Sequence, residues 1–182
     1  TTIGTSSTRR SAIIRALRPD LTVVPFRGNV QTRLKKLEEG IADATLLAAA
    51  GLNRLGQHNR ITQWLPPETM LPAIAQGAIG IECRESDTEM REILLQINHL
   101  STMQAVSAER AVLGVLDGSC KTPLSGYAQI VSNQLTLRAL LLQPDGSEQW
   151  HASANGPVSD AEAIGRDVGN RLLSLAKDKI VL

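Results

Sequence analysis

The chain has very few aromatic residues: two tryptophans, one tyrosine and one phenylalanine among 182 residues. Because bases stack on aromatic rings in proteins that bind single-stranded nucleic acid, this scarcity argues against such a function. The charge also argues against nucleic-acid binding, since the formal net charge is only +1 and binding to phosphate backbones usually requires a pronounced basic excess. We therefore expect no nucleic-acid partner.

Long apolar runs are also absent. No stretch of about 18 apolar residues occurs, so the sequence predicts no membrane-spanning helix and no membrane partner. The first residues, Thr1-Thr-Ile-Gly4, show no basic region followed by an apolar one, as a secretory signal would. Cys83 and Cys120 are the only cysteines, which favours a reducing compartment, and we expect a cytoplasmic protein. A hydrophobic content of 42% is enough for one large or two small cores.

Hydrophobic periodicity predicts an α/β fold in the first third of the chain. Apolar, strand-like runs alternate with helical patterns up to about residue 60, which is typical of βαβ units. The predicted elements are helices over 9–17, 30–39 and 51–55 and strands over 21–26 and 44–49.

Beyond residue 60 the pattern changes. Residues 78–83 are predicted to form a single strand that crosses between domains. Two helices and three strands should follow, over 88–97, 102–116, 124–131, 135–142 and 149–154. Turns are expected at Ser132-Asn133 and at Pro144-Asp-Gly146. A final helix over 160–176 places Ile164, Val168, Leu172 and Leu175 on one face, so the carboxy-terminal part should be a small α+β domain with a three-stranded antiparallel sheet backed by helices.

Two arginine clusters occur beside turn residues in the first third. They are Thr5-Ser-Ser-Thr-Arg-Arg10 and Arg27-Gly-Asn-Val-Gln-Thr-Arg33. Each follows a short apolar run and begins a helical pattern, so hydroxyls, backbone N–H groups and guanidinium groups should meet at the carboxyl edge of the sheet. Such an edge binds carboxylates or phosphates in α/β proteins. The other interpretation is local, because Ser7 and Asn29 are also good helix N-caps and arginines are common on surfaces.

Cys120 is the third feature. It lies in Asp117-Gly-Ser-Cys-Lys-Thr-Pro123, where a glycine, a cationic neighbour and a proline frame the sulfur and favour an exposed thiolate. A lone cysteine is more often a small buried hydrophobe, and that is our interpretation of Cys83.

Six ordered runs give the chain a resemblance to the porphobilinogen deaminase, or hydroxymethylbilane synthase, family. They are Gly4-Thr-Ser-Ser-Thr-Arg-Arg10, Arg27-Gly-Asn-Val-Gln-Thr-Arg33, Ala50-Gly-Leu-Asn-Arg-Leu-Gly56, Leu71-Pro-Ala-Ile-Ala-Gln-Gly-Ala-Ile-Gly-Ile-Glu82, Ala108-Glu-Arg-Ala111 and Gly118-Ser-Cys-Lys-Thr-Pro123. The family joins four porphobilinogen units into a linear tetrapyrrole for heme biosynthesis, releasing ammonia at each step, on a dipyrromethane cofactor linked to a cysteine.

The resemblance implies roles for individual residues. Cys120 matches the cysteine that forms the thioether. The residues that match contacts to the cofactor are Thr5, Ser7, Arg9, Arg10 and Arg27, and Asn29 could face the same cleft. Arg33 and Arg54 match positions that bind substrate carboxylates. Porphobilinogen and the growing polypyrrole are thus the expected partners, with no metal, and the complete protein is expected to be a monomer.

The resemblance also predicts a division into domains. Residues 1–72 should be part of a second, periplasmic-binding-protein-like doubly wound α/β domain that carries the arginines. Residues 73–99 should return to a first domain, and residues 100–182 should form the α+β domain that carries Cys120. The family's catalytic aspartate matches nothing in this chain and is expected upstream of Thr1, so we expect the chain alone to be inactive.

Two positions depart from the family pattern, since Ser119 and Ala75 stand where glycine is usual. A side chain at a position that requires positive φ costs about 1 kcal/mol or more. Two rival functions remain open at this point. A non-catalytic anion-binding module would use the same arginines without needing a reactive thiol, and an inactive remnant would show neither anion binding nor a cofactor adduct.

Overall fold

The computed structural model describes residues 1–116, 122–177 and 179 of the chain. These residues form two compact units. The first unit holds Thr1–Leu71 together with Leu141–Trp150, and the second holds most of the remainder. Each unit is built around one three-stranded sheet, so the fold is mixed α/β, as the sequence predicts.

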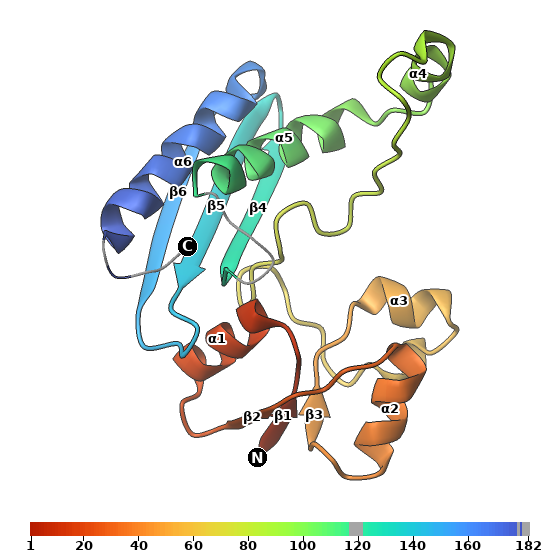
Figure 1. Cartoon of the computed structure of the whole chain (residues 1–182), viewed down its shortest axis with the longest axis vertical. Helices are drawn as coiled ribbons and strands as arrows, with labels where there is room; N and C mark the ends of the chain where they lie inside the picture. The colour runs from red at the N-terminus through yellow and green to blue at the C-terminus, as the bar shows by residue number, and fades with distance from the viewer. Residues whose placement is uncertain (117–121, 178, 180–182) are drawn as a thin grey trace. The chain divides into compact units, whose positions relative to one another are not determined.

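The sheet of the first unit is parallel, with strand order β2-β1-β3 (Figure 1). Its strands are β1 (Thr2–Gly4), β2 (Thr22–Val24) and β3 (Ala44–Thr45). The helices of the unit are α1 (Thr8–Leu17), α2 (Val30–Glu38), α3 (Ala49–Arg54) and the short 3-10 helix η1 (His58–Arg60). Since α1 joins β1 to β2 and α2 joins β2 to β3, the predicted βαβ units are confirmed. The strands are shorter than predicted, and β3 gives way to α3 four residues after it ends.

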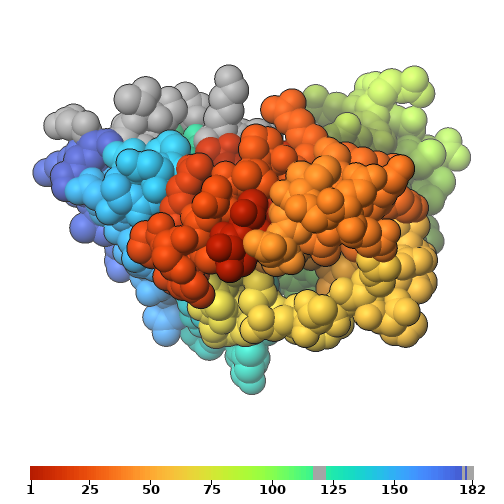
Figure 2. Space-filling view, turned by 90° about the horizontal axis from the view of Figure 1, so that it is seen from below, coloured from red at the N-terminus to blue at the C-terminus, as the bar shows by residue number. Residues whose placement is uncertain are grey.

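The core of the first unit is small. Helix α1 buries Ala12, Ile13 and Ile14, whereas α2 buries no residue fully. Phe26 is completely buried, and its ring lies so close to Gly4 that a Cβ there would come within 2.5 Å of it. Thr1 is exposed, and the amino-terminal residues, dark red in Figure 2, lie at the surface of this unit.

The other sheet, most of which belongs to the second unit, is antiparallel, with order β4-β5-β6. Its strands are β4 (Leu124–Val131), β5 (Gln134–Leu142) and β6 (Gln149–Pro157). The Leu142 N–H donates to the Pro123 carbonyl at 3.1 Å, so the end of β5 meets the start of β4. Ser132 and Asn133 link β4 to β5, and both have positive φ, 49° and 63°. This two-residue turn suits the twist of a hairpin and confirms the predicted turn.

Two long helices cover one face of this sheet (Figure 1): α5 (Leu100–Val115) and α6 (Ala161–Ala176). Helix α6 buries Ile164, Val168 and Leu172, as its periodicity predicts. Leu175, which the sequence places on the same face, is 54% exposed and lies outside the core. Ala176 is the buried residue of the last turn, because the neighbours available there, rather than periodicity alone, decide which side chain is covered.

Glycine at position 165 allows α5 and α6 to approach. A Cβ at Gly165 would overlap the Ala108 carbonyl oxygen and the Ala111 side chain of α5. We expect Gly165→Val to lower the free energy of unfolding by about 3 kcal/mol, because the side chain forces the helices apart. Chemical denaturation measures the change.

The matched control is Gly114 on α5, around which a Cβ would meet no atom within 4 Å. Gly114→Ala should raise the free energy of unfolding by up to about 1 kcal/mol, since alanine is the better helix former. Equal, small effects of both substitutions would show that the two helices do not depend on this close approach.

The predicted strand over 78–83 is not formed. These residues have no regular secondary structure, and Ile79 and Ile81 are 91% and 57% exposed. The alternating pattern is that of a strand, but a strand also needs a neighbour to accept and donate its backbone hydrogen bonds, and the described residues supply none here. Cys83 is exposed as a result, so its interpretation as a core residue is wrong. Helix α4 (Thr88–Leu95) follows, close to its prediction.

Candidate anion-binding site

Three loops of the first unit meet at the carboxyl edge of its parallel sheet. The segment after β1 carries Thr5, and the Thr5 N–H donates to the Val24 carbonyl of β2 at 3.0 Å. The Ser6 hydroxyl accepts a hydrogen bond from the Phe26 N–H at 2.8 Å. The loops after β1 and β2 are therefore fixed to one another, as the predicted meeting of the two arginine clusters requires.

Both predicted N-caps are confirmed. The Ser7 hydroxyl accepts from the Arg10 N–H at 3.3 Å, and the Asn29 side chain accepts from the Thr32 N–H at 2.9 Å. These bonds satisfy backbone donors at the starts of α1 and α2. Thr5 is only 3% exposed, and its hydroxyl accepts from the Ser7 N–H at 3.2 Å. The polar residues of the edge thus have structural roles in the chain itself.

Arg9 and Arg10 extend from the first turn of α1 to backbone carbonyls. Arg9 Nη1 donates to Leu71 O at 2.8 Å, and Arg10 Nη1 donates to Leu46 O at 2.8 Å. Burial, with a contribution from Arg10, lowers the pKa of Arg9 to about 10. Burial also lowers the pKa of Arg10, with a contribution from Arg33. Both guanidinium groups remain protonated at neutral pH, but their charge is partly desolvated.

Arg9, Arg10 and Arg33 form a group that we call the arginine cluster. Their positive charges act on one another, since Arg10 contributes to the lowered pKa of Arg9 and Arg33 to that of Arg10. Arg33 Nε donates to Gly28 O at 2.8 Å. Across the residues that the structure describes, no member of the cluster forms an ion pair. Half-buried guanidinium groups retain N–H donors and repel each other, so a bound polycarboxylate would both satisfy the donors and relieve the repulsion.

Two other predicted arginines are not joined to the cluster by any described contact. Arg27 is exposed, and its carbonyl accepts from Lys36 Nζ at 3.0 Å. Arg54 lies in the last turn of α3 and is exposed. Their roles in ligand binding stay predictions.

Cys120 and Ser119 lie outside the described residues. The predicted thioether position and the effect of the serine therefore stay predictions. The helix that precedes this part of the sequence, α5, ends at Val115.

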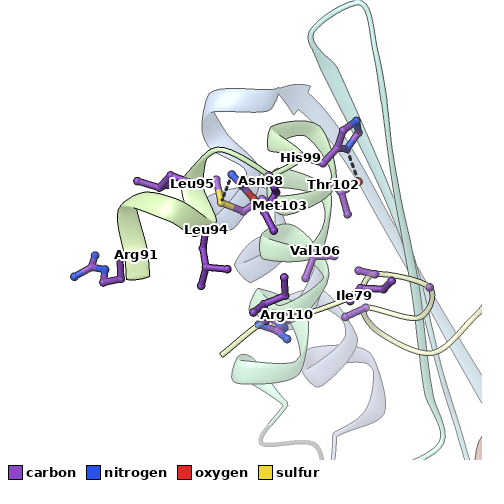
Figure 3. A pocket seen from close by; sticks show the side chains of 16 residues that line it. Ile79, Arg91, Leu94, Leu95, Asn98, His99, Thr102, Met103, Val106 and Arg110 are labelled. Carbon is purple, nitrogen blue, oxygen red and sulfur yellow. Dashed lines mark hydrogen bonds between the residues drawn. The ribbon is translucent and has the colours of Figure 1, made fainter. Parts of the chain in front are cut away.

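A hollow in the second unit is mostly apolar (Figure 3). It has a volume of about 660 Å³ and lies between residues 77–81, α4 and α5. Ile79, Leu94 and Val106 contribute to its wall. His99 bonds Thr102 at 2.7 Å at its margin. None of the predicted cofactor or substrate residues lines this hollow, so the arginine cluster is the better candidate for an anion site.

Sequence reasoning missed two kinds of contact. The carbonyls of Leu46 and Leu71 hold the arginines, but backbone acceptors leave no signal in a sequence. Glu109 was noted as part of the Ala108-Glu-Arg-Ala111 run, without a role. Its side chain is buried and binds two backbone N–H groups.

Within the described ranges, the structure groups no three side chains that could together ligate a metal ion. None of the described helices is both long enough and apolar enough to cross a bilayer.

Comparison with known proteins also supports a site that binds a polycarboxylate. Residues 1–92 match the family described as "Porphobilinogen deaminase, dipyromethane cofactor binding domain", and residues 103–174 match "Porphobilinogen deaminase, C-terminal domain". A porphobilinogen deaminase of Syntrophobacter fumaroxidans (strain DSM 10017 / MPOB) is 49% identical over 179 residues. The chain belongs to the porphobilinogen deaminase family. The resemblance that the sequence motifs carry is confirmed. The aligned residues cover 98% of the chain but only 58% of that relative.

The arginine cluster lies wholly within the match to the cofactor-binding domain of porphobilinogen deaminases. Its chemistry fits a dipyrromethane, whose acetate and propionate groups are carboxylates. Guanidinium groups bind carboxylates through two parallel N–H donors, which a lysine cannot supply.

Proposed function

We propose that this chain holds the cysteine-linked dipyrromethane and the growing polypyrrole of a porphobilinogen deaminase that makes hydroxymethylbilane. The arginine cluster, which forms no ion pair within the described part of the chain, is the observation that carries the proposal. Arg9 and Arg10 hold cofactor carboxylates, together with Thr5, Ser7, Arg27 and Asn29. Arg33 and Arg54 bind the carboxylates of substrate and product. When bound, the cofactor would supply the pyrrole carbon to which the first porphobilinogen is joined.

Cys120 anchors the cofactor in this proposal, and the acid group lies outside the chain. A thiolate is a soft nucleophile that suits a single capture of a pyrrole methylene carbon. The positive charge that develops when ammonia leaves needs a fixed carboxylate. Because none of the chain's residues matches the family's aspartate, the chain is a partial enzyme that is inactive alone. A cytoplasmic location and a monomeric complete enzyme belong to the same proposal.

The domain division also follows this proposal. Right-handed crossovers with the strand order β2-β1-β3 place α1 and α2 on opposite faces, which supports a doubly wound, periplasmic-binding-protein-like second domain over residues 1–72. Residues 73–99 return to a first domain, and the exposure of Ile79 and Ile81 supports a strand there that needs a partner. Residues 100–182 form the third domain.

Reconstitution tests the function. We expect the purified chain to form no tetrapyrrole from porphobilinogen. Once the family's amino-terminal portion is co-expressed with it, we expect tetrapyrrole to form. Absorbance of the oxidised porphyrin measures the product. Product from the chain alone would contradict the need for an outside acid group. No product from the pair, with porphobilinogen still stabilising the chain against heat, would favour a non-catalytic anion-binding module; an inert remnant would show neither.

A further inference from the structure

Glu109 is a buried carboxylate on α5 that faces backbone and forms no ion pair with any residue that the structure describes. It is 6% exposed. Its Oε2 accepts from the Ala75 N–H at 2.6 Å, and its Oε1 accepts from the Ala128 N–H of β4 at 2.9 Å. One side chain therefore joins α5 to β4 and to a segment 34 residues earlier in the chain.

The segment that Glu109 holds, residues 72–76, contains a left-handed turn. Ala75 has φ 56°, which is unfavourable for any residue with a Cβ. The Pro72 carbonyl accepts from the Gly126 N–H of β4 at 3.1 Å. The Ile74 side chain fills the place that a Cβ on Gly126 would occupy. The turn is thus pressed against β4 at Pro72 and Ile74, and Glu109 fixes its strained residue.

We propose that the ionised Glu109 carboxylate is a positioning residue that holds residues 72–76 against β4, and that its protonation releases this turn. A carboxylate offers each N–H an oxygen that only accepts. A carboxylic acid keeps one good acceptor and turns its other oxygen into a donor, which opposes an N–H. The strain at Ala75 then favours departure from the left-handed conformation. We call this contact of Glu109 with residues 72–76 the latch. It is a property of the fold and stands whether or not the chain takes part in tetrapyrrole synthesis.

The surroundings of Glu109 make protonation accessible. Burial raises the pKa of the Glu109 carboxyl, and the bonds from Ala128 and Ala75 oppose this effect only in part. Residues 72–77 carry no ionisable side chain. The adjoining ionisable residues are Arg110 on α5 and Tyr127 on β4, and on the packed helix α6 Glu162 pairs with Arg166 at 3.2 Å. Relative to the unfolded chain, the raised pKa means that Glu109 lowers the free energy of unfolding as pH rises from its unfolded pKa through its folded pKa. Relative to a folded chain in which the turn has left and Glu109 stays buried, the held carboxyl has the lower pKa, because the two N–H bonds lower it, so a falling pH favours release of the turn.

Amide hydrogen exchange on the full chain tests the latch through protection factors, in which intrinsic pH effects are divided out. At neutral pH, Glu109→Gln should lower the protection of Ala75, Ala128 and Gly126 at least about tenfold. Gly126 is the informative amide, because it bonds Pro72 and does not contact the carboxylate. In the wild type the same three amides should lose protection as pH falls through the Glu109 pKa. The matched control, Glu92→Gln at an exposed position on α4, should change none of them.

Ala75→Gly supplies the second variant, because glycine adopts the left-handed turn without strain. In the Glu109→Gln background it should restore Gly126 protection to within about threefold of the wild type. Loss of protection at Ala75 and Ala128 with Gly126 unchanged would overturn the proposal, since Glu109 would then only satisfy two N–H groups. Wild-type protection of Gly126 that does not change with pH would overturn it as well, even if Glu109→Gln failed to fold.

Discussion

Replacing Cys120 with serine, in the chain supplied with the family's amino-terminal portion, is expected to abolish covalent loading of dipyrromethane. The sulfur reacts as thiolate, and the cationic Lys121 beside it favours that form. A serine hydroxyl of the same shape stays protonated at neutral pH and is a weak nucleophile without an adjacent base. Intact-mass measurement should show an adduct on the wild-type chain and none on Cys120→Ser, and tetrapyrrole formation should fall to background.

Cys83→Ser is a demanding control for this experiment, because Cys83 is exposed and could also react. We expect this variant to keep both the adduct and the activity. If Cys120→Ser carried the adduct and Cys83→Ser did not, the anchor would be Cys83 and the assignment would be contradicted.

Replacement of Arg9 or Arg10 by leucine should reduce cofactor binding by about 2–5 kcal/mol, since a carboxylate held in a partly desolvated site loses its fixed partner. The fold itself should change little, within about 1 kcal/mol. Each substitution removes a bond to a carbonyl, but it also removes a desolvated charge that repels its neighbour. Cofactor incorporation by mass and thermal melting of the cofactor-free chain measure the two effects separately.

Arg18 at the other end of α1 is the matched control. It is exposed and pairs with Asp20 at 2.6 Å, so Arg18→Leu should leave cofactor incorporation unchanged. Equal losses at Arg9, Arg10 and Arg18 would indicate a general effect of charge. Wild-type incorporation in Arg9→Leu and Arg10→Leu would show that the cluster is ordinary surface charge.

Local sequence signals predicted the helices and hairpin well because the forces that form them act within a few residues. Ser7 and Asn29 cap helices that begin at the next residue, and Ser132-Asn133 alone supply the positive φ of the hairpin. The strand over 78–83 failed because its formation depends on a partner strand, which its own pattern cannot provide. The exposure of Cys83 follows from that failure.

For the candidate site, the sequence by itself determined that Arg9, Arg10 and Arg33 would lie at one edge, because parallel strands in βαβ units bring their carboxyl ends together. It also determined the family, through ordered motifs that include Cys120. Only the tertiary structure decided that the arginines hold carbonyls as far as 62 residues away, and that their charges are partly desolvated. The role of Glu109 was decided in the same way, since a glutamate on a helix is ordinarily solvated. The Glu109 side chain is buried between α5, β4 and residues 72–76. That burial depends on contacts between distant segments, which local sequence patterns do not record.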